Sequence, residues 1–369
     1  MKKSSEQIST VQLMFSVACF IQASTLLTYP IHGFAKQEAW ICVLLGCLIS
    51  LPIIWIYTSL AKRFPGKSLI EINDIVFGSI VGKIFSVLYI YFFLNLVFLS
   101  SRDIGNFVGG FLLPTTPLPA VLIMFLLVCC WAVRKGVKTM TSYAKLMVII
   151  AFAVLLFNSL LLLNIMKFSN LLPIFSLPLK NYLEGSHTTA MLPMCELMAF
   201  LMLFPNLRNA KGSAKALWGG FAIGAITLFF NVARDTAVLG PYASLLTSPT
   251  FLVARLINVG TIFTRMEVLY AVTIIILMFF KTSVLLYAAV FGISQLLKLD
   301  SYKFLVPTFG AIAVIFAIAV FDSTMYESYI AMTGTASIYA TFFELILPVI
   351  TLTVAAVRGF SGKKEAVLL

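Results

Sequence analysis

The sequence predicts an all-α integral membrane protein with about ten transmembrane helices. Hydrophobic residues make up 61% of the 369 residues, charged residues 11%, and the mean hydropathy is +1.03. A soluble domain of this size has no core large enough for so many apolar side chains. The apolar residues also fall into separate runs of roughly 20, the length at which a helix crosses a hydrocarbon core. We therefore expect one transmembrane domain over 1–369.

The distribution of charge predicts how the chain is oriented in the lipid bilayer. The ten predicted spans are 9–31, 39–60, 81–104, 116–133, 143–165, 187–206, 214–238, 266–292, 303–321 and 337–357. With a cytoplasmic N-terminus, 18 of the 26 Lys and Arg residues lie inside and 7 outside, Arg102 and Arg234 among them, and Lys281 stays in the membrane. This asymmetry favours cytoplasmic termini, including a short tail at 358–369. Because the basic residues sit in short clusters between spans, the net charge of +12 does not indicate nucleic-acid binding.

Two connections carry the signals of short surface helices. The stretch after the second predicted span begins with Ser68 and has Glu71 three residues later, which is a capping-box pattern. The stretch after the seventh span offers Ser248 as N-cap and Pro249 at the first helical position. The two helices follow spans five apart and are expected on opposite sides of the membrane.

This spacing predicts two inverted repeats of five spans each, over about 9–165 and 187–357. In transporters built this way, spans 1 and 6 are interrupted near the middle of the bilayer. Span 1 has the polar or small residues 22–25, QAST, in an otherwise apolar run, and span 6 contains Pro193 and Glu196. Such residues let a helix unwind, because proline removes a backbone hydrogen bond and small polar side chains help to solvate the freed groups.

Four segments resemble the endospore germination permeases, the B subunits of spore germinant receptors in the amino acid–polyamine–organocation superfamily. They are RFPGKSLIEI followed by VGKIFSVLYIYFFL, then SRDIGNFVGGFLLPTTPL, CELMAFLMLFPNLRNAKG and FTRMEVLYAVTIIILMFFKTSVLLYA. The resemblance covers nearly the whole chain. It implies a leucine-transporter-like fold and a small germinant, often an amino acid, bound among spans 1, 3, 6 and 8. It also implies assembly with an A subunit and a lipoprotein C subunit in the spore inner membrane. Span 1 departs from the superfamily pattern, since IQASTLL has no glycine.

Lys281 in span 8 is the strongest candidate for a functional residue. An ammonium near the middle of the bilayer is costly unless it is paired or faces a wet cavity. The resemblance implies a fixed cation in place of a coupling sodium ion, with the hydroxyls of Thr282 and Ser283 beside it. Alternatively, Lys281 binds a ligand carboxylate, or it holds helices together through an ion pair with Glu196 or Glu344. The sequence leaves these roles open.

The predicted ligand contacts come from the spans that the resemblance brings together. The candidates are Gln22, Ala23, Ser24, Thr25, Tyr91, Asn95, Glu196, Phe200, Lys281 and Thr282. Glu196 can bind a ligand amine, carry a proton or pair with Lys281. Tyr91 and Asn95 are four residues apart and share a helix face, either as ligand contacts or as links between helices.

The sequence carries no enzyme signature, no metal-ligand spacing and no cofactor motif. The leading hypothesis is a germinant sensor that binds its ligand in a transporter-like pocket. The alternatives are a proton- or cation-coupled amino acid transporter and an ion or water conduit that opens during germination.

Overall fold

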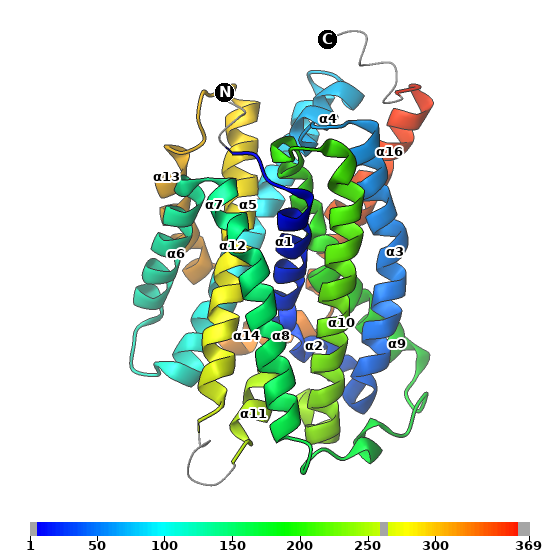
Figure 1. Ribbon diagram of the computed structural model, residues 1–369, viewed down its shortest axis with the longest axis vertical. Helices are drawn as coiled ribbons and strands as arrows, with labels where there is room; N and C mark the ends of the chain where they lie inside the picture. Colours follow the sequence, from blue (N-terminus) through cyan, green and yellow to red (C-terminus); the bar gives the residue numbers. More distant parts are fainter. Residues whose placement is uncertain (1–5, 259–264, 361–369) are drawn as a thin grey trace.

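The structure is a computed structural model and describes residues 6–258 and 265–360. The chain forms a bundle of helices that run between two ends (Figure 1), with the start of α1, the end of α16 and α4 at the same end. The first helices are α1 (Thr10–Ala23), α2 (Tyr29–Ala35), α3 (Ala39–Arg63), α4 (Leu69–Phe77), α5 (Val81–Phe107), α6 (Leu118–Lys135), α7 (Val137–Ser142) and α8 (Ala144–Leu161). They are followed by α9 (Leu179–Thr189), α10 (Ser213–Leu239), α11 (Pro249–Arg255), α12 (Glu267–Leu296), α13 (Leu305–Ala319), α14 (Thr324–Met332), α15 (Thr335–Thr341) and α16 (Leu347–Val357).

Within the described ranges, eight helical segments are long and apolar enough to cross a membrane, against ten predicted spans. The predicted span 303–321 contains α13, whose 15 residues fall short of a full crossing. The predicted span 187–206 is not one α-helix, because the chain changes its helical form twice within it. Of the predicted tail, only 358–360 belongs to the described residues. The division into two repeats stays a prediction.

Both predicted helix interruptions are present. Span 1 consists of α1, a 3₁₀ segment at Ser24–Leu27, and α2. The side chains of the break bond to carbonyl groups three residues back: the Thr25 hydroxyl donates to the Gln22 carbonyl (2.9 Å) and the Thr28 hydroxyl to the Thr25 carbonyl (3.1 Å). Hydroxyl side chains therefore stabilise a break that contains no glycine.

The break in span 6 is longer. After α9 come a π-helical turn at Ala190–Met194 and a 3₁₀ segment at Cys195–Met202. Pro193 lies inside the π-helical turn, where its missing N–H prevents a regular α-helical hydrogen bond. Every residue of the 3₁₀ segment is buried, so this irregular backbone is surrounded by protein rather than by lipid.

Helix α12 lies at the centre of the bundle. Its most apolar window is 83% buried, more than that of any other helical segment long enough to span. It packs against α1, α5, α6, α8 and α13. The polar side chains near the middle of α12, Lys281, Thr282 and Ser283, therefore lie in the protein interior.

The predicted surface helices form as α4 and α11. The capping box of α4 is present, since the Glu71 N–H donates to the Ser68 hydroxyl (3.2 Å) and the Ser68 N–H to the Glu71 carboxylate (2.9 Å). Helix α11 begins at Pro249 after Ser248, as predicted, but the Ser248 side chain makes no capping hydrogen bond. The N-terminal proline, which needs no hydrogen-bond acceptor, is the part of the predicted start signal that the structure uses.

Candidate functional site

Lys281 joins the two interrupted spans to α12. Its ammonium nitrogen lies 2.5 Å from Oε2 of Glu196, in the 3₁₀ segment of span 6, and donates a hydrogen bond to the Ser24 hydroxyl (2.9 Å) at the break in span 1. Lys281 is 0% and Glu196 4% exposed. Of the two predicted carboxylate partners, Glu196 forms the ion pair. The geometry links three separate backbone segments through one cation.

Two phenylalanines cover this ion pair. The Lys281 ammonium lies 5.0 Å from the centroid of the Phe20 ring, a distance at which the ring face attracts a cation. The Phe20 ring meets that of Phe200 edge to face, with 5.4 Å between the centroids. Phe200 is fully buried, so it forms an apolar wall behind Phe20.

A second carboxyl group, that of Glu344, lies close enough to Glu196 and Lys281 for its charge to interact with theirs. Glu344 is in a π-helical turn at Phe342–Ile346, is 0% exposed, and neither of its side-chain oxygens has a hydrogen-bond partner among the described residues. Tyr57 connects this π-helical turn to the 3₁₀ segment of span 6, because its hydroxyl lies 2.6 Å from the Glu344 carbonyl oxygen and 3.0 Å from the Cys195 carbonyl oxygen. The cluster thus holds one ammonium and two carboxyl groups.

The other two residues of the predicted cation site follow Lys281 on α12. Thr282 and Ser283 are both buried. The Thr282 hydroxyl has no hydrogen-bond partner within the described part of the chain, and Ser283 faces Cys129 of α6. Of the three residues, Lys281 is the one that bonds to span 1.

Glu196 also lines a cavity that opens between the two breaks. The cavity has a volume of about 80 Å³. Its walls come from Leu27 and α2, from Ser100 and Asp103 of α5, and from Ile330 and Ala331 of α14. A small ligand in this cavity can contact a carboxylate on one side and apolar side chains on the other.

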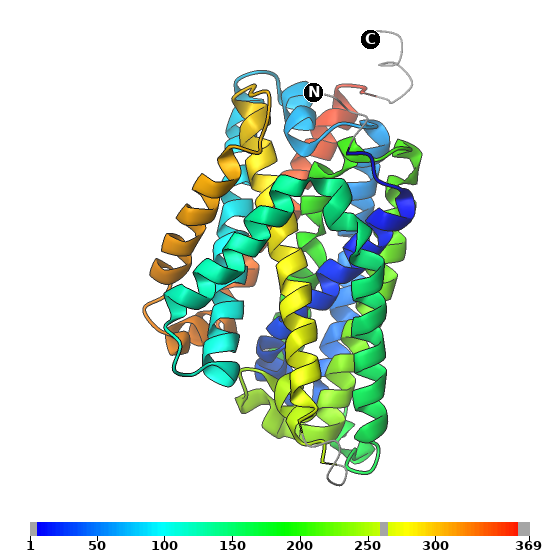
Figure 2. The same cartoon turned by 60° about the vertical axis from the view of Figure 1, so that its left-hand side comes forward.

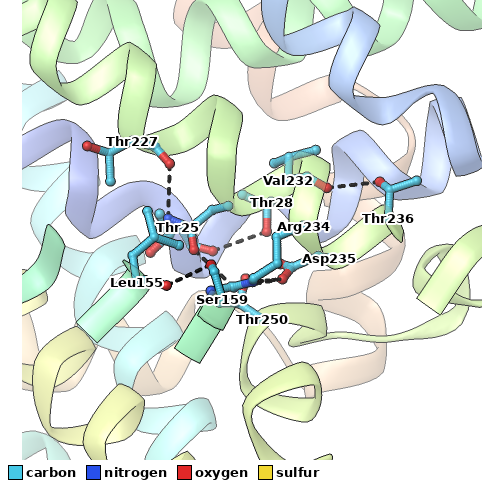
Figure 3. A network of polar contacts seen from close by, with 11 residues as sticks. Thr25, Thr28, Leu155, Ser159, Thr227, Val232, Arg234, Asp235, Thr236 and Thr250 are labelled. Carbon is cyan, nitrogen blue, oxygen red and sulfur yellow. Dashed lines mark hydrogen bonds and ion pairs between the residues drawn. The ribbon is translucent and has the colours of Figure 1, made fainter. Parts of the chain in front are cut away.

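The remaining predicted residues of span 1 point elsewhere. The Gln22 amide donates to the Thr227 hydroxyl of α10 (3.1 Å), and Thr25 bonds to its own helix. Ala23 is fully buried. Figure 3 shows Thr25 and Thr227 in a polar network that extends along α10. Within the QAST stretch, Ser24 is therefore the residue that bonds to Lys281.

The network around α10 was not predicted. Arg234 was expected outside the membrane, yet it is buried and bonds to Oδ1 of Asp235 (2.7 Å) and Oδ1 of Asn231 (3.1 Å), as Figure 3 shows in part. Asp235 also accepts from the Thr250 hydroxyl of α11 (2.5 Å). Arg102 is likewise buried, with its guanidinium on the Ala317 and Ile318 carbonyls. The spacing of Asn231, Arg234 and Asp235 on one helix face was the available signal.

The structure does not bring Tyr91 and Asn95 to Lys281. Tyr91 is 54% exposed on the outer face of α5, and Asn95 is only partly buried. The inner face of α5 carries Phe92, which stacks on Phe343 with 4.5 Å between the ring centroids. The i, i+4 spacing correctly placed the two polar residues on one face, but packing decided which face turns inward.

Comparisons with known proteins agree with this architecture. A family model described as spore germination protein matches residues 7–326. In Bacillus subtilis (strain 168), spore germination protein KB is 30% identical over 305 residues, which is 79% of each chain. Spore germination protein YndE of the same organism is 26% identical over 361 residues, 95% of this chain and 97% of the relative.

Solved transporter structures share the fold at low sequence identity. MhsT in complex with L-phenylalanine aligns with a TM-score of 0.72 and 12% identity, covering 95% of this chain and 89% of MhsT. Mhp1, a nucleobase-cation-symport-1 family transporter in a closed conformation with bromovinylhydantoin bound, aligns with a TM-score of 0.64 and 13% identity, covering 95% and 78%. These likenesses confirm the predicted leucine-transporter-like fold. The chain belongs to the spore germination protein family and is an integral membrane protein with a transporter-like fold.

Proposed function

We propose that this chain is the membrane subunit of a spore germinant receptor and that it binds a small germinant in the cavity beside Glu196. The observation that carries the proposal is the position of Glu196, which lines this cavity and is paired with Lys281 between the two helix breaks. In the proposed complex, an A subunit and a lipoprotein C subunit in the spore inner membrane receive the signal.

The chemistry of the cavity favours a small neutral amino acid. The ammonium of the bound amino acid replaces Lys281 as the partner of Glu196, and the carboxylate of the amino acid pairs with the Lys281 ammonium. A ligand that supplies both charges compensates both residues when the ion pair separates, whereas a ligand with one charge leaves a buried ion unpaired. The apolar walls formed by Leu27 and Ala331 suit a short aliphatic side chain.

The same exchange provides a signal. Lys281 links span 1, span 6 and α12, so a ligand that separates it from Glu196 changes how these segments are held together. A ligand shifts a conformational equilibrium only if it binds one state more tightly. The ion pair supplies that difference, because it is intact in one state and replaced by ligand contacts in the other. Without ligand, Lys281 acts as the fixed cation between spans 1 and 8.

Binding to purified protein in nanodiscs tests this proposal. A panel of radiolabelled small neutral amino acids is added to the wild type, to Glu196→Gln and to Ala331→Phe, which fills the cavity without changing charge. We expect both variants to lose binding, while Glu184→Gln, a matched change in a partly exposed pair with Lys180, binds like the wild type. Binding that survives in folded Ala331→Phe would overturn the proposed site.

The same protein in proteoliposomes separates sensing from transport. The sensor hypothesis expects ligand binding without accumulation against a gradient. Accumulation in the absence of partner subunits would instead favour a proton- or cation-coupled amino acid transporter, and ligand-induced ion or water flux without ligand uptake would favour a conduit.

A further inference from the structure

A groove between α6 and α13 has none of its lining residues in the ion-pair cluster. Its volume is about 810 Å³. The two helices lie side by side at one edge of the bundle in both views (Figures 1 and 2). Leu127 of α6 and Ile315 of α13 both line the groove and are each 63% exposed. The groove is therefore open to the surroundings of the bundle, where lipid is the solvent.

The floor of the groove is formed by small residues. A Cβ atom on Gly310 would lie 2.2 Å from the Cys130 sulfur, so α6 and α13 approach each other closely at this point. The next residue, Ala311, also lines the groove. The close contact that small residues offer to a neighbouring helix is thus already used between α6 and α13.

The length of the groove matches one leaflet of a bilayer. On α6 the lining runs from Ile123 to Lys135. At a rise of about 1.5 Å per residue, this stretch is roughly 18 Å long. Half of a hydrocarbon core about 30 Å thick has a similar extent. An extended acyl chain can follow the groove through its leaflet.

One end of the groove is basic. Arg134 and Lys135 end α6 and line the groove, and both are exposed. Neither forms an ion pair with another described residue. The Lys135 ammonium lies 5.6 Å from the Trp131 ring centroid, in the arrangement by which tryptophan and lysine mark a membrane interface. This end of α6 lies toward the end of the bundle that holds α4 (Figure 1).

We propose that this groove binds one anionic phospholipid, with an acyl chain against Gly310 and Ala311 and the headgroup phosphate on Arg134 and Lys135. Charge complementarity selects the headgroup, because two unpaired cations favour a lipid with net negative charge over a zwitterionic one. An arginine guanidinium also matches the geometry of a phosphate. A partner helix is less suited, since an apolar helix would leave both cations without a counter-charge.

Native mass spectrometry of the full chain tests the site with phosphatidylglycerol and phosphatidylcholine as probes. The wild type should retain phosphatidylglycerol in preference to phosphatidylcholine. The double variant R134Q/K135Q should lower the apparent affinity for phosphatidylglycerol by roughly tenfold or more, given two basic contacts near the headgroup. The matched control is K211Q/K215Q, which removes two exposed lysines near the start of α10 and should behave like the wild type.

A second variant separates the groove from general surface charge. Ala311→Phe fills the groove and keeps both cations, so it should lose lipid retention while the charge is unchanged. Retention of phosphatidylglycerol in Ala311→Phe, or equal losses in the two double variants, would overturn the proposal. A protein partner that co-purifies and cross-links to Cys130 in place of lipid would also overturn it.

Discussion

At the scale of single residues, the interior of this protein contains an imbalance of ionisable groups. Lys281 and Glu196 neutralise each other, while Glu344 has neither an ion pair nor a side-chain hydrogen bond among the described residues. A charged carboxylate buried without a partner is costly, whereas a protonated one is a neutral polar group. The cluster is neutral when Glu344 holds a proton.

This imbalance predicts a large loss of stability for one Glu→Gln substitution and almost none for the other. Glu196→Gln leaves the Lys281 ammonium buried without its counter-charge, and the loss of one partner of a buried pair costs about 3–5 kcal/mol. Glu344→Gln replaces a neutral acid by a neutral amide of similar shape and should change stability by about 1 kcal/mol or less. Thermal unfolding of both variants in detergent measures the difference. Equal destabilisation would show that Glu344 is charged or paired in the folded protein.

The residues of the ion pair were predictable, but their arrangement was only partly so. A lysine in an apolar run must find a partner, so Lys281 and the candidate Glu196 follow from hydropathy alone. The sequence does not say which carboxylate pairs with Lys281. It also does not say that Ser24, rather than Gln22 or Thr25, bonds to the lysine. Both depend on how the broken spans are rotated about their axes. Tyr91 shows the same limit, because a shared face does not say whether that face turns to the protein or to lipid.

At the scale of elements, the contact between α1 and α10 depends on glycine. A Cβ on Gly220 would lie 2.4 Å from the Met14 carbonyl oxygen, and a Cβ on Gly224 would lie 2.6 Å from the Ile21 Cβ. Both contacts are shorter than real Cβ atoms adopt, so side chains on α10 would push α1 away. Since α1 leads directly into the Ser24 break, its position also determines the geometry at Lys281.

We therefore expect Gly224→Ala to destabilise the protein and to disturb the site. Overpacking in a filled interior typically costs about 1–3 kcal/mol. Gly109→Ala is a suitable control, because a Cβ there meets no atom within 4 Å. Thermal unfolding, together with amino acid binding, should show a loss in Gly224→Ala that the control lacks. Unchanged stability of Gly224→Ala would mean that α1 moves without cost.

The elements themselves differ in how far their sequence determines them. The capping box of α4 and the proline start of α11 are local signals, and both helices begin where these signals predict. Span 187–206 is different: Pro193 predicts an interruption, but the length of the break and its π and 3₁₀ turns depend on the surrounding helices that bury it. Burial of Arg234 also escaped prediction, because its partner Asp235 is held in turn by the Thr250 hydroxyl of α11, a separate element.

At the scale of the whole molecule, the bundle has two distinct ends. The start of α1 and the end of α16 lie at one end, which requires an even number of crossings between them (Figure 1). Lys62 lies in the last turn of α3, just before α4 at this end. Lys180, which is 80% exposed, lies at the start of α9 near the opposite end. The two lysines therefore mark opposite sides of the membrane.

Labelling with a membrane-impermeant thiol reagent tests this arrangement and its orientation. In intact cells, Lys180→Cys should react, whereas Lys62→Cys should react only after permeabilisation, because the excess of basic residues favours a cytoplasmic location for its end. The unmodified protein is the control, since its six cysteines are buried or only partly exposed within helices or helical turns. Reaction of both variants from the same side would contradict the bundle. An exchanged pattern would keep the bundle and reverse its orientation, which would place the basic end of the α6–α13 groove in the outer leaflet.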